Sequence, residues 1–393
     1  MRAHLRHGLR AAGGRWSFAQ FMHEALYAPG LGYYAAGARK FGRDGDFVTA
    51  PEISPVFGGC LARQAAEVFG ELRRQAPGSP LTLVEYGAGS GALAEQLLLA
   101  LAALDAVPDV YAIVEVSADL RERQAQRLAA RLPSALSRRV VWWPGHASQP
   151  WRGVLVANEV LDALPVERLR VGGQGLEQCF VECADCAADA DLHLVWRPAD
   201  AAVDAAAAAG ALGEWSAWPA GTGFEWCPAI ASWIPEALAE LAAGVALYID
   251  YGLPRAALRG PGRSAGTFSA FFRHRQHEDA LLHPGLQDLT AWVDFTAVAE
   301  AGLAAGASVG GFTTQAQFLV NSGLDQVFAS ALAAVAADGA GGDHVRRQAE
   351  LSQGVQRLVM PQEMGERFRI LALLKGYDAD LIGFARRDLT FTL

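Results

Sequence analysis

The sequence predicts an α/β protein in which helices cover both faces of a mostly parallel sheet. A buried apolar strand at residues 81–86 is followed directly by three alternate glycines, Gly87, Gly89 and Gly91. After this turn, strand and helix patterns alternate along the chain, which is the order of a parallel sheet with right-handed crossovers. Glycines at the carboxyl end of a first strand let bare backbone approach a nucleotide-like ligand.

The core elements follow from apolar runs and helical periods along the chain. Near the glycine turn these patterns predict helices at 55–74, 91–104 and 117–131 and strands at 110–115, 140–143 and 153–157. Later in the chain they predict a strand at 245–250, helices at 288–304 and 315–338, and closing strands at 368–374 and 381–386.

Other regions depart from this alternation. The capping box Ser17-Phe18-Ala19-Gln20 begins a helix that ends near Tyr27. The glycine- and aromatic-rich stretch 30–52 is predicted to be a loop, and the stretch 260–288 is also loop-like. Between 166 and 240 the patterns predict short antiparallel strands at 169–171, 179–182 and 192–196 and an alanine-rich helix or linker at 201–212. We therefore divide the chain into an N-terminal helical and loop segment that contributes to the ligand site (1–75), an α/β core (76–165, 241–311 and 356–393), an inserted β-rich and helical subdomain (166–240) and a helical insertion (312–355).

The composition narrows the function and the compartment. The 393 residues are 52% hydrophobic and carry a net charge of −9, so a large core is easily built and a nucleic-acid-binding surface is disfavoured. No apolar run approaches the roughly 20 residues of a membrane helix, so we expect no membrane insertion. We expect a bacterial cytoplasmic protein, and a mitochondrial one only if the arginine-rich N-terminus is a presequence.

Three cysteines are spaced as in some metal sites, Cys179-x3-Cys183-x2-Cys186. This spacing is found at iron–sulfur clusters and zinc sites. Here it lies in the predicted antiparallel region, far from the glycine turn, where side-chain alternation along a strand does not bring three thiols together. Structural cysteines are therefore favoured, and no metal is predicted.

Polar side chains follow the ends of four predicted strands, at positions 85, 115, 158–162 and 250–251. An acid such as Glu115, at the tip of the second strand, suits the two hydroxyls of a ribose in dinucleotide-binding and S-adenosylmethionine-binding folds. The alternative role for Asp162 is to cap the next helix. The spacing Gly87-x-Gly89-x-x-Ala92 also fits a nicotinamide fingerprint, but no catalytic His or Tyr-x-x-x-Lys pair accompanies it.

Six segments spread over most of the chain match one known family. They are 27–34 (YAPGLGYY), 45–54 (GDFVTAPEIS), 85–91 (EYGAGSG), 157–165 (ANEVLDALP), 250–252 (DYG) and 360–365 (MPQEMG). On these residues the chain resembles the MidA-like family of class I S-adenosylmethionine-dependent methyltransferases, which includes a mitochondrial complex I assembly factor that methylates an arginine. The family usually has Gly-Pro-Gly-Arg-Gly where this chain has Gly-Ala-Gly-Ser-Gly, a departure that removes one charge contact but no glycine.

The resemblance implies a seven-stranded, Rossmann-like class I core that takes S-adenosyl-L-methionine and releases S-adenosylhomocysteine. The residues expected at the cofactor are Thr49, Glu52, Glu85, Gly87, Ala88, Gly89, Gly91, Glu115, Val116, Asn158 and Glu159. A protein arginine is the expected acceptor. Carboxylates orient a guanidinium and assist its proton loss, so Glu159 and Asp162, followed by Glu52, are the catalytic candidates. The alternative is an assembly or chaperone-like partner that keeps the fold; the oligomeric state is left open.

Overall fold

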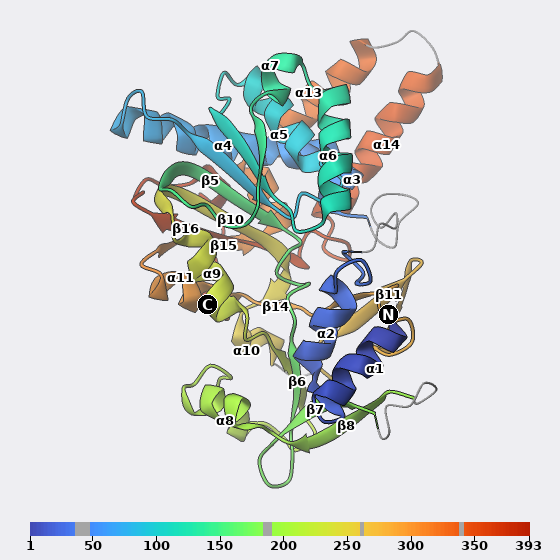
Figure 1. The fold of residues 1–393 in the computed structure, drawn as a ribbon. Coiled ribbons are helices and arrows are strands. Elements are labelled where there is room, and N and C mark those ends of the chain that lie inside the picture. Colours follow the sequence, from blue (N-terminus) through green and yellow to red (C-terminus); the bar gives the residue numbers. More distant parts are fainter. Residues whose placement is uncertain (36–47, 184–190, 260–262, 338–341) are drawn as a thin grey trace.

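A computed structural model describes residues 1–35, 48–183, 191–259, 263–337 and 342–393 (Figure 1). Its central sheet has the strand order β15-β16-β10-β5-β2-β3-β4, and the two-residue β14 pairs with β10 as an eighth strand. The strands are β2 (Thr82–Tyr86), β3 (Val110–Val114), β4 (Val140–Trp143), β5 (Trp151–Asn158), β10 (Leu241–Leu253), β14 (Val293–Asp294), β15 (Ser308–Thr314) and β16 (Phe368–Lys375). Strands β4, β3, β2, β5 and β10 are parallel, and β16 runs antiparallel to both of its neighbours. The expected α/β class with a mostly parallel sheet is confirmed.

The register of the sheet brings the predicted strand ends together. Tyr86 on β2 lies opposite Val114 on β3 and Ala157 on β5. The residues that follow these strands therefore emerge side by side at the carboxyl edge, as expected for neighbouring parallel strands.

Helices cover both faces of this sheet because its strands alternate apolar side chains between the faces. On one face, a core cluster that includes Leu83 and Val154 packs against α4 (Pro55–Gln75), α5 (Ala92–Ala103) and α6 (Ala118–Arg131). The same cluster takes residues from α12 (Gln315–Asn321), α13 (Leu324–Ala337) and α14 (Gly342–Val359). On the other face, Val84 and Leu155 pack with α9 (Ile230–Leu238) and α11 (Phe295–Ala304).

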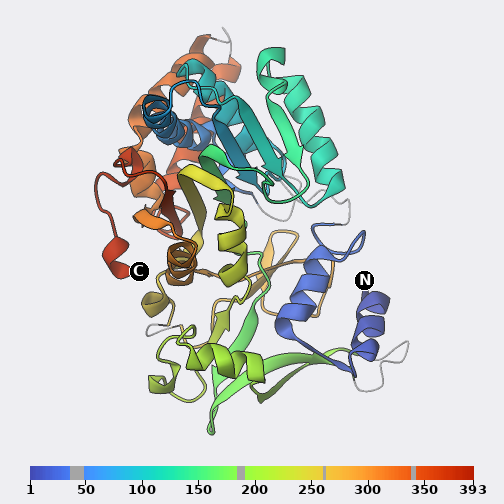
Figure 2. The same cartoon turned by 60° about the vertical axis from the view of Figure 1, so that its left-hand side comes forward.

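A second lobe lies beyond the carboxyl edge of the sheet, in the lower half of Figures 1 and 2. Its helices are α1 (Arg2–Ala11), α2 (Phe18–Tyr27) and α8 (Ala201–Ala208). Its strands are β1 (Arg15–Ser17), β6 (Glu167–Val171), β7 (Leu176–Glu182), β8 (His193–Pro198), β9 (Gly223–Trp226), β11 (Ser269–Phe272), β12 (Arg275–His277) and β13 (Asp288–Thr290). Phe21, Val181 and Leu289 share one core cluster, so three distant parts of the chain pack together. The domain boundaries given above stay a prediction.

Short elements complete the fold. The short helices are α3 (Ala50–Ile53), α7 (Ser134–Ser137), α8 (Ala201–Ala208) and α10 (Arg255–Leu258), with 3-10 turns at Trp215–Ala217, Ile382–Phe384 and Thr390–Thr392. No single helix in the described ranges is long and apolar enough to span a membrane. The bent pair α12 and α13 passes that test only when the two helices are taken together, by length and composition.

Several predicted elements are confirmed, and others are wrong for identifiable reasons. The predicted strands and helices between residues 55 and 158 form near their predicted bounds. The helix after the capping box and the strand at 368–374 do so as well. The stretch 260–288 is not all loop, because it holds β11 and β12 and reaches β13. The predicted helix at 288–304 begins only at Phe295, where Asp294 caps it by accepting from the Ala297 N–H.

Two further corrections concern the C-terminal third. The predicted helix at 315–338 is two helices that meet at 76°, and Gly323, with φ of 82°, lies at the break. The predicted strand at 381–386 is a 3-10 turn. Its backbone N–H groups at Ile382 and Gly383 donate to Glu67 and Gln64 of α4, which replaces the ladder bonds of a strand. The predicted loop at 30–52 is wrong at its end, where Ala50–Ile53 form α3, and its Tyr33 belongs to a core cluster. Residues 36–47 lie outside the described ranges.

Candidate functional site

A cavity of about 780 Å³ lies at the carboxyl edge of the sheet, between the sheet and the second lobe. Its walls come from the segments that follow β2, β3, β4 and β5, together with side chains from α2, β11 and β13. Five carboxylates line it, those of Glu85, Glu115, Glu159, Asp162 and Asp288. No Lys or Arg is among the lining residues in the described part of the chain. A cavity with this charge favours a cationic ligand.

The glycine turn presents backbone to the cavity. Gly87 has φ of 63°, and a Cβ built there would lie 3.0 Å from a methyl group of Val160. Its N–H donates to the Val114 carbonyl at 2.9 Å, which fixes the turn to β3. A side chain at this position is therefore both strained and crowded, which explains the glycine. Gly87, Ala88 and Gly89 line the cavity, whereas Gly91 caps α5 and does not.

Glu85 lies one residue before the end of β2 and is almost fully buried, with 2% of its surface exposed. The Tyr111 hydroxyl donates to its Oε2 at 2.6 Å. Burial raises the pKa of Glu85 to about 7, although the Tyr111 hydrogen bond opposes the rise. Glu85 is thus poised to gain or lose a proton near neutral pH, depending on the charge of its ligand.

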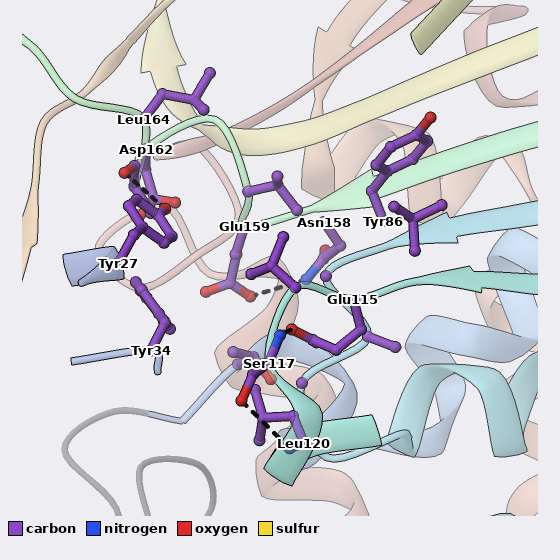
Figure 3. Close-up of a pocket in the computed structure, with 18 of the residues that line it drawn as sticks. Tyr27, Tyr34, Tyr86, Glu115, Ser117, Leu120, Asn158, Glu159, Asp162 and Leu164 are labelled. Atoms are coloured by element: carbon purple, nitrogen blue, oxygen red, sulfur yellow. Dashed lines mark hydrogen bonds between the residues drawn. The ribbon is translucent and has the colours of Figure 1, made fainter. Parts of the chain in front are cut away.

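Glu115 is held by two donors at the end of β3. The Ser117 N–H donates to Oε1 at 3.0 Å (Figure 3). The Gln124 amide donates to Oε2 at 3.1 Å. Burial raises the pKa of Glu115, and these hydrogen bonds counteract the rise. The two donors fix the orientation of the carboxylate and leave lone pairs for further donors, such as ribose hydroxyls.

Gln124 was missed by the sequence analysis. Its amide also donates to the Gly89 carbonyl at 3.0 Å, and its Oε1 accepts from the Trp142 indole at 3.0 Å. One buried side chain therefore joins the glycine turn, Glu115 and β4. The available signal was a glutamine at the centre of the apolar i, i+4 row Leu120, Gln124 and Leu128 of an amphipathic helix.

Asn158 ends β5, Glu159 follows it, and both project into the cavity (Figure 3). Asn158 donates from Nδ2 to Glu159 Oε1 at 3.1 Å. Its Oδ1 is buried, and no described residue donates to it. Buried polar atoms are nearly always paired, so this oxygen points to a ligand that donates a hydrogen bond.

Glu159 has an unusual backbone and an unusual charge environment. Its φ is 54°, a left-handed value that is costly for a residue with a Cβ and is concentrated at functional sites. Its Oε1 also accepts from the Ala50 N–H at 3.2 Å. Burial, and then repulsion by Asp162, raises the pKa of Glu159 to about 8. Its side chain is partly exposed to the cavity, so a bound cation would lower this pKa.

Asp162 is oriented by β10. The Tyr251 hydroxyl donates to its Oδ2, and burial raises the pKa of Asp162 to about 6. Asp250, predicted on the ligand side, does not line the cavity. It is fully buried and accepts from the backbone N–H groups of Leu161 and Asp162, at 3.0 and 3.2 Å. Asp250 therefore shapes the loop that presents the acids, and Asp162 does not act as a helix cap in the described structure.

Glu52 and Thr49 are placed differently from each other. Thr49 lines the cavity and Glu52 does not. Glu52 accepts from the Ser90 hydroxyl and lies 3.7 Å from the Arg127 guanidinium, which itself donates to Ser90 at 3.3 Å. Arg127 of α6 thus places a guanidinium beside Ser90 of the glycine turn. We leave Glu52 out of the proposed catalytic set because its carboxylate is engaged outside the cavity.

The second lobe adds lining residues that the sequence analysis did not propose, including Tyr27, Tyr34, Asp288 and Thr290. Beside the sheet, the predicted residue Val116 lines the cavity with 78% of its surface exposed, a bare apolar wall. Cys179 and Cys183 are buried, and Cys186 lies outside the described ranges. Within those ranges no group of three metal-ligating side chains was found.

Comparison with known proteins identifies the chain's relatives. Residues 60–313 match a family model described as "Putative S-adenosyl-L-methionine-dependent methyltransferase". The mitochondrial protein arginine methyltransferase NDUFAF7 of mouse is 31% identical, over 95% of this chain and 84% of its own length, and the human protein is 30% identical, over 95% and 83%. A Burkholderia thailandensis crystal structure bound to S-adenosyl-homocysteine superposes with a TM-score of 0.88 at 39% identity, covering all of this chain and 96% of that one.

The cavity fits S-adenosyl-L-methionine. The glycine turn leaves room for a ligand against the backbone, and Glu115 offers a fixed carboxylate to ribose hydroxyls. The unpaired Asn158 Oδ1 calls for a hydrogen-bond donor, and the cofactor carries an ammonium and an adenine amino group. Val116 provides an apolar wall for a flat ring. The assignment of each residue to a part of the cofactor stays a prediction.

Proposed function

We propose that this chain, which belongs to the family of S-adenosyl-L-methionine-dependent methyltransferases, transfers the methyl group to an arginine side chain of a protein. The cofactor is S-adenosyl-L-methionine, and the acceptor is the proposed part. The curated relatives at about 30% identity are named protein arginine methyltransferases, which supports this acceptor. A cytoplasmic location stays a prediction.

The observation that carries the proposal is the pair of carboxylates Glu159 and Asp162 in a cavity whose described lining holds no Lys or Arg. Buried carboxylates without a cation are costly, because each loses its hydration. A bound guanidinium would offset that cost with charge-assisted hydrogen bonds, and its planar fork suits carboxylate oxygens.

The residues divide the chemical work in a simple way. When bound, the cofactor supplies an electrophilic methyl group on a sulfonium sulfur. A guanidinium is a poor nucleophile because its lone pairs are delocalised in a cation. Asp162, held by Tyr251, would orient the guanidinium and localise its charge. Glu159 would accept the departing proton at Oε2, because its Oε1 already accepts from Ala50 and Asn158.

The test begins with an extract of the protein's own host, labelled with methyl-tritiated S-adenosyl-L-methionine and the purified enzyme. Proteins that gain label are hydrolysed, and the amino acids are separated. We expect the label in methylarginine. Label in methyllysine, methylhistidine or a methyl ester would contradict the arginine assignment.

A binding measurement is needed to interpret an experiment in which no protein gains label. Isothermal titration calorimetry with S-adenosylhomocysteine, with NADH as a control ligand, checks the cofactor site directly. Cofactor binding without any labelled protein would favour the alternative role, a partner protein that retains the fold.

A further inference from the structure

One wall of the cavity belongs to the second lobe and carries Asp288. We infer that Asp288, held by Tyr34, is a specificity-determining residue that binds the cationic side chain of the acceptor. This inference rests on the proposed function, because it gives the acceptor's charged group a partner outside the α/β core. The core then binds the cofactor, and the second lobe selects the substrate.

The position of Asp288 is fixed from two sides. It begins β13, which pairs with β11 so that Asp288 lies opposite Phe271. Only 3% of its surface is exposed, and it lines the cavity. Its Oδ1 accepts from the Tyr34 hydroxyl at 2.9 Å and from the Leu289 N–H at 3.0 Å. Such a carboxylate is already oriented before a ligand arrives.

The charge of Asp288 acts on Glu159, one of the two proposed catalytic acids. Its proximity raises the pKa of Glu159 and also those of Tyr27 and Tyr34. Asp288, Asp162 and Glu159 therefore contribute negative potential to the same part of the cavity. Three carboxylates so placed repel one another, and a cation among them reverses the sign of that interaction.

Asp288 is grouped with tyrosines on one side of Glu159. Figure 3 shows Asp162, Tyr27 and Tyr34 on one side of Glu159, with Glu115 and Ser117 on the other. Asp288 contacts this first group, because the Tyr34 hydroxyl donates to it. The rings of Tyr27 and Tyr34 stack at 5.6 Å on the same side, and the Tyr27 hydroxyl donates to the Ala163 carbonyl at 3.0 Å. These contacts tie the second lobe to the loop that presents Asp162.

The experiment uses the full-length protein saturated with S-adenosylhomocysteine. Calorimetry measures its affinity for capped tripeptides Gly-Arg-Gly, Gly-citrulline-Gly and Gly-Lys-Gly. We expect the arginine peptide to bind at least tenfold more tightly than the neutral citrulline isostere. Asp288→Asn should weaken the arginine peptide roughly tenfold, the loss expected for one charge-assisted hydrogen bond, and leave S-adenosylhomocysteine affinity unchanged.

The control variant is Glu278→Gln, which makes the same charge change at an exposed residue of the same lobe that does not line the cavity. It should leave all affinities unchanged. Should Asp288→Asn lose the cofactor as well, Tyr34→Phe carries the test, because it removes the hydrogen bond and keeps the charge. A several-fold weaker arginine peptide in Tyr34→Phe supports the inference.

Three results would overturn the inference. The first is an arginine peptide that binds Asp288→Asn, or Tyr34→Phe where that variant carries the test, as tightly as it binds the wild type. The others are equal affinity of the wild type for the citrulline and arginine peptides, and no binding of the arginine peptide to the wild type up to about 10 mM. Equal binding of the lysine peptide, weakened by Asp288→Asn, would support the inference while weighing against arginine as the acceptor. The failure of the proposed function is thus distinguishable from the failure of this assignment.

Discussion

The two walls of the cavity are built in contrasting ways. The sheet wall comes from consecutive strand ends, where Gly87, Glu115 and Asn158 emerge side by side because the strands are parallel and in register. The opposite wall is assembled from α2, β11 and β13, and α2 lies roughly 250 positions before the two strands along the chain. The geometry of the sheet wall is fixed by the strands, so it suits one kind of ligand. The residues of the opposite wall can be exchanged to bind a different substrate without disturbing the cofactor site.

The strongest test of the sheet wall is Gly87→Val. The new side chain meets Val160 and is forced into a left-handed backbone, so we expect S-adenosylhomocysteine affinity to fall by more than about 100-fold. Calorimetry measures the loss. Gly70→Ala, in α4 with open space around its Cβ position, is the matched control and should bind normally. Normal binding by Gly87→Val would break the assignment of this wall to the cofactor.

Glu159 lies between the two walls, and Glu159→Gln tests its proposed role in transfer. The amide keeps the size of the side chain but cannot accept the acceptor's proton, so the rate constant for transfer should fall by roughly 100-fold or more. Cofactor affinity should change little. Single-turnover transfer to the acceptor protein identified by the labelling experiment measures the rate constant. A variant that turns over like the wild type would remove Glu159 from the mechanism.

The pH dependence sharpens the same boundary. With a pKa near 8 before a cation binds, Glu159 is largely protonated at pH 6, so kcat/KM for transfer should rise with pH by up to about tenfold per unit and level off above pH 8. This limb should vanish in Glu159→Gln.

The same shift affects folding, with the opposite sign. A carboxyl whose folded pKa is raised stabilises the fold in its protonated form, fully below its ordinary pKa of 4.5. That contribution is lost as the pH rises through about 8. Between pH 4.5 and 8, the melting temperature should fall less with rising pH in Glu159→Gln than in the wild type. An equal fall in the two proteins would contradict the raised pKa of Glu159.

The smallest expected effect belongs to Gln124→Met. Methionine fills the same volume but frees Glu115 and the Gly89 carbonyl from their shared donor, so cofactor affinity should fall roughly fivefold. Gln126→Met, an exposed neighbour on the same helix, should bind S-adenosylhomocysteine as the wild type does. Unchanged binding in Gln124→Met would show that Glu115 needs no support from α6.

The sheet wall could be predicted from the sequence, and the opposite wall could not. Glu115 and Glu159 were found because each follows an apolar strand, and a parallel sheet places all such ends at one edge. Asp288 was hidden, since its stretch fits a helical period and its neighbours in space are remote in sequence. Glu52 shows the limit of motif reasoning: its segment was recognised, but only the contacts with Ser90 and Arg127 reveal that its carboxylate is engaged outside the cavity.

The place of β16 has a consequence for biosynthesis. It is the last strand along the chain, yet it lies between β10 and β15 in the interior of the sheet. Until residues 368–375 leave the ribosome, β10 and β15 each present an open hydrogen-bonding edge. Such edges recruit other chains, so a nascent or truncated polypeptide that lacks this strand should be a preferred client of chaperones and prone to aggregation.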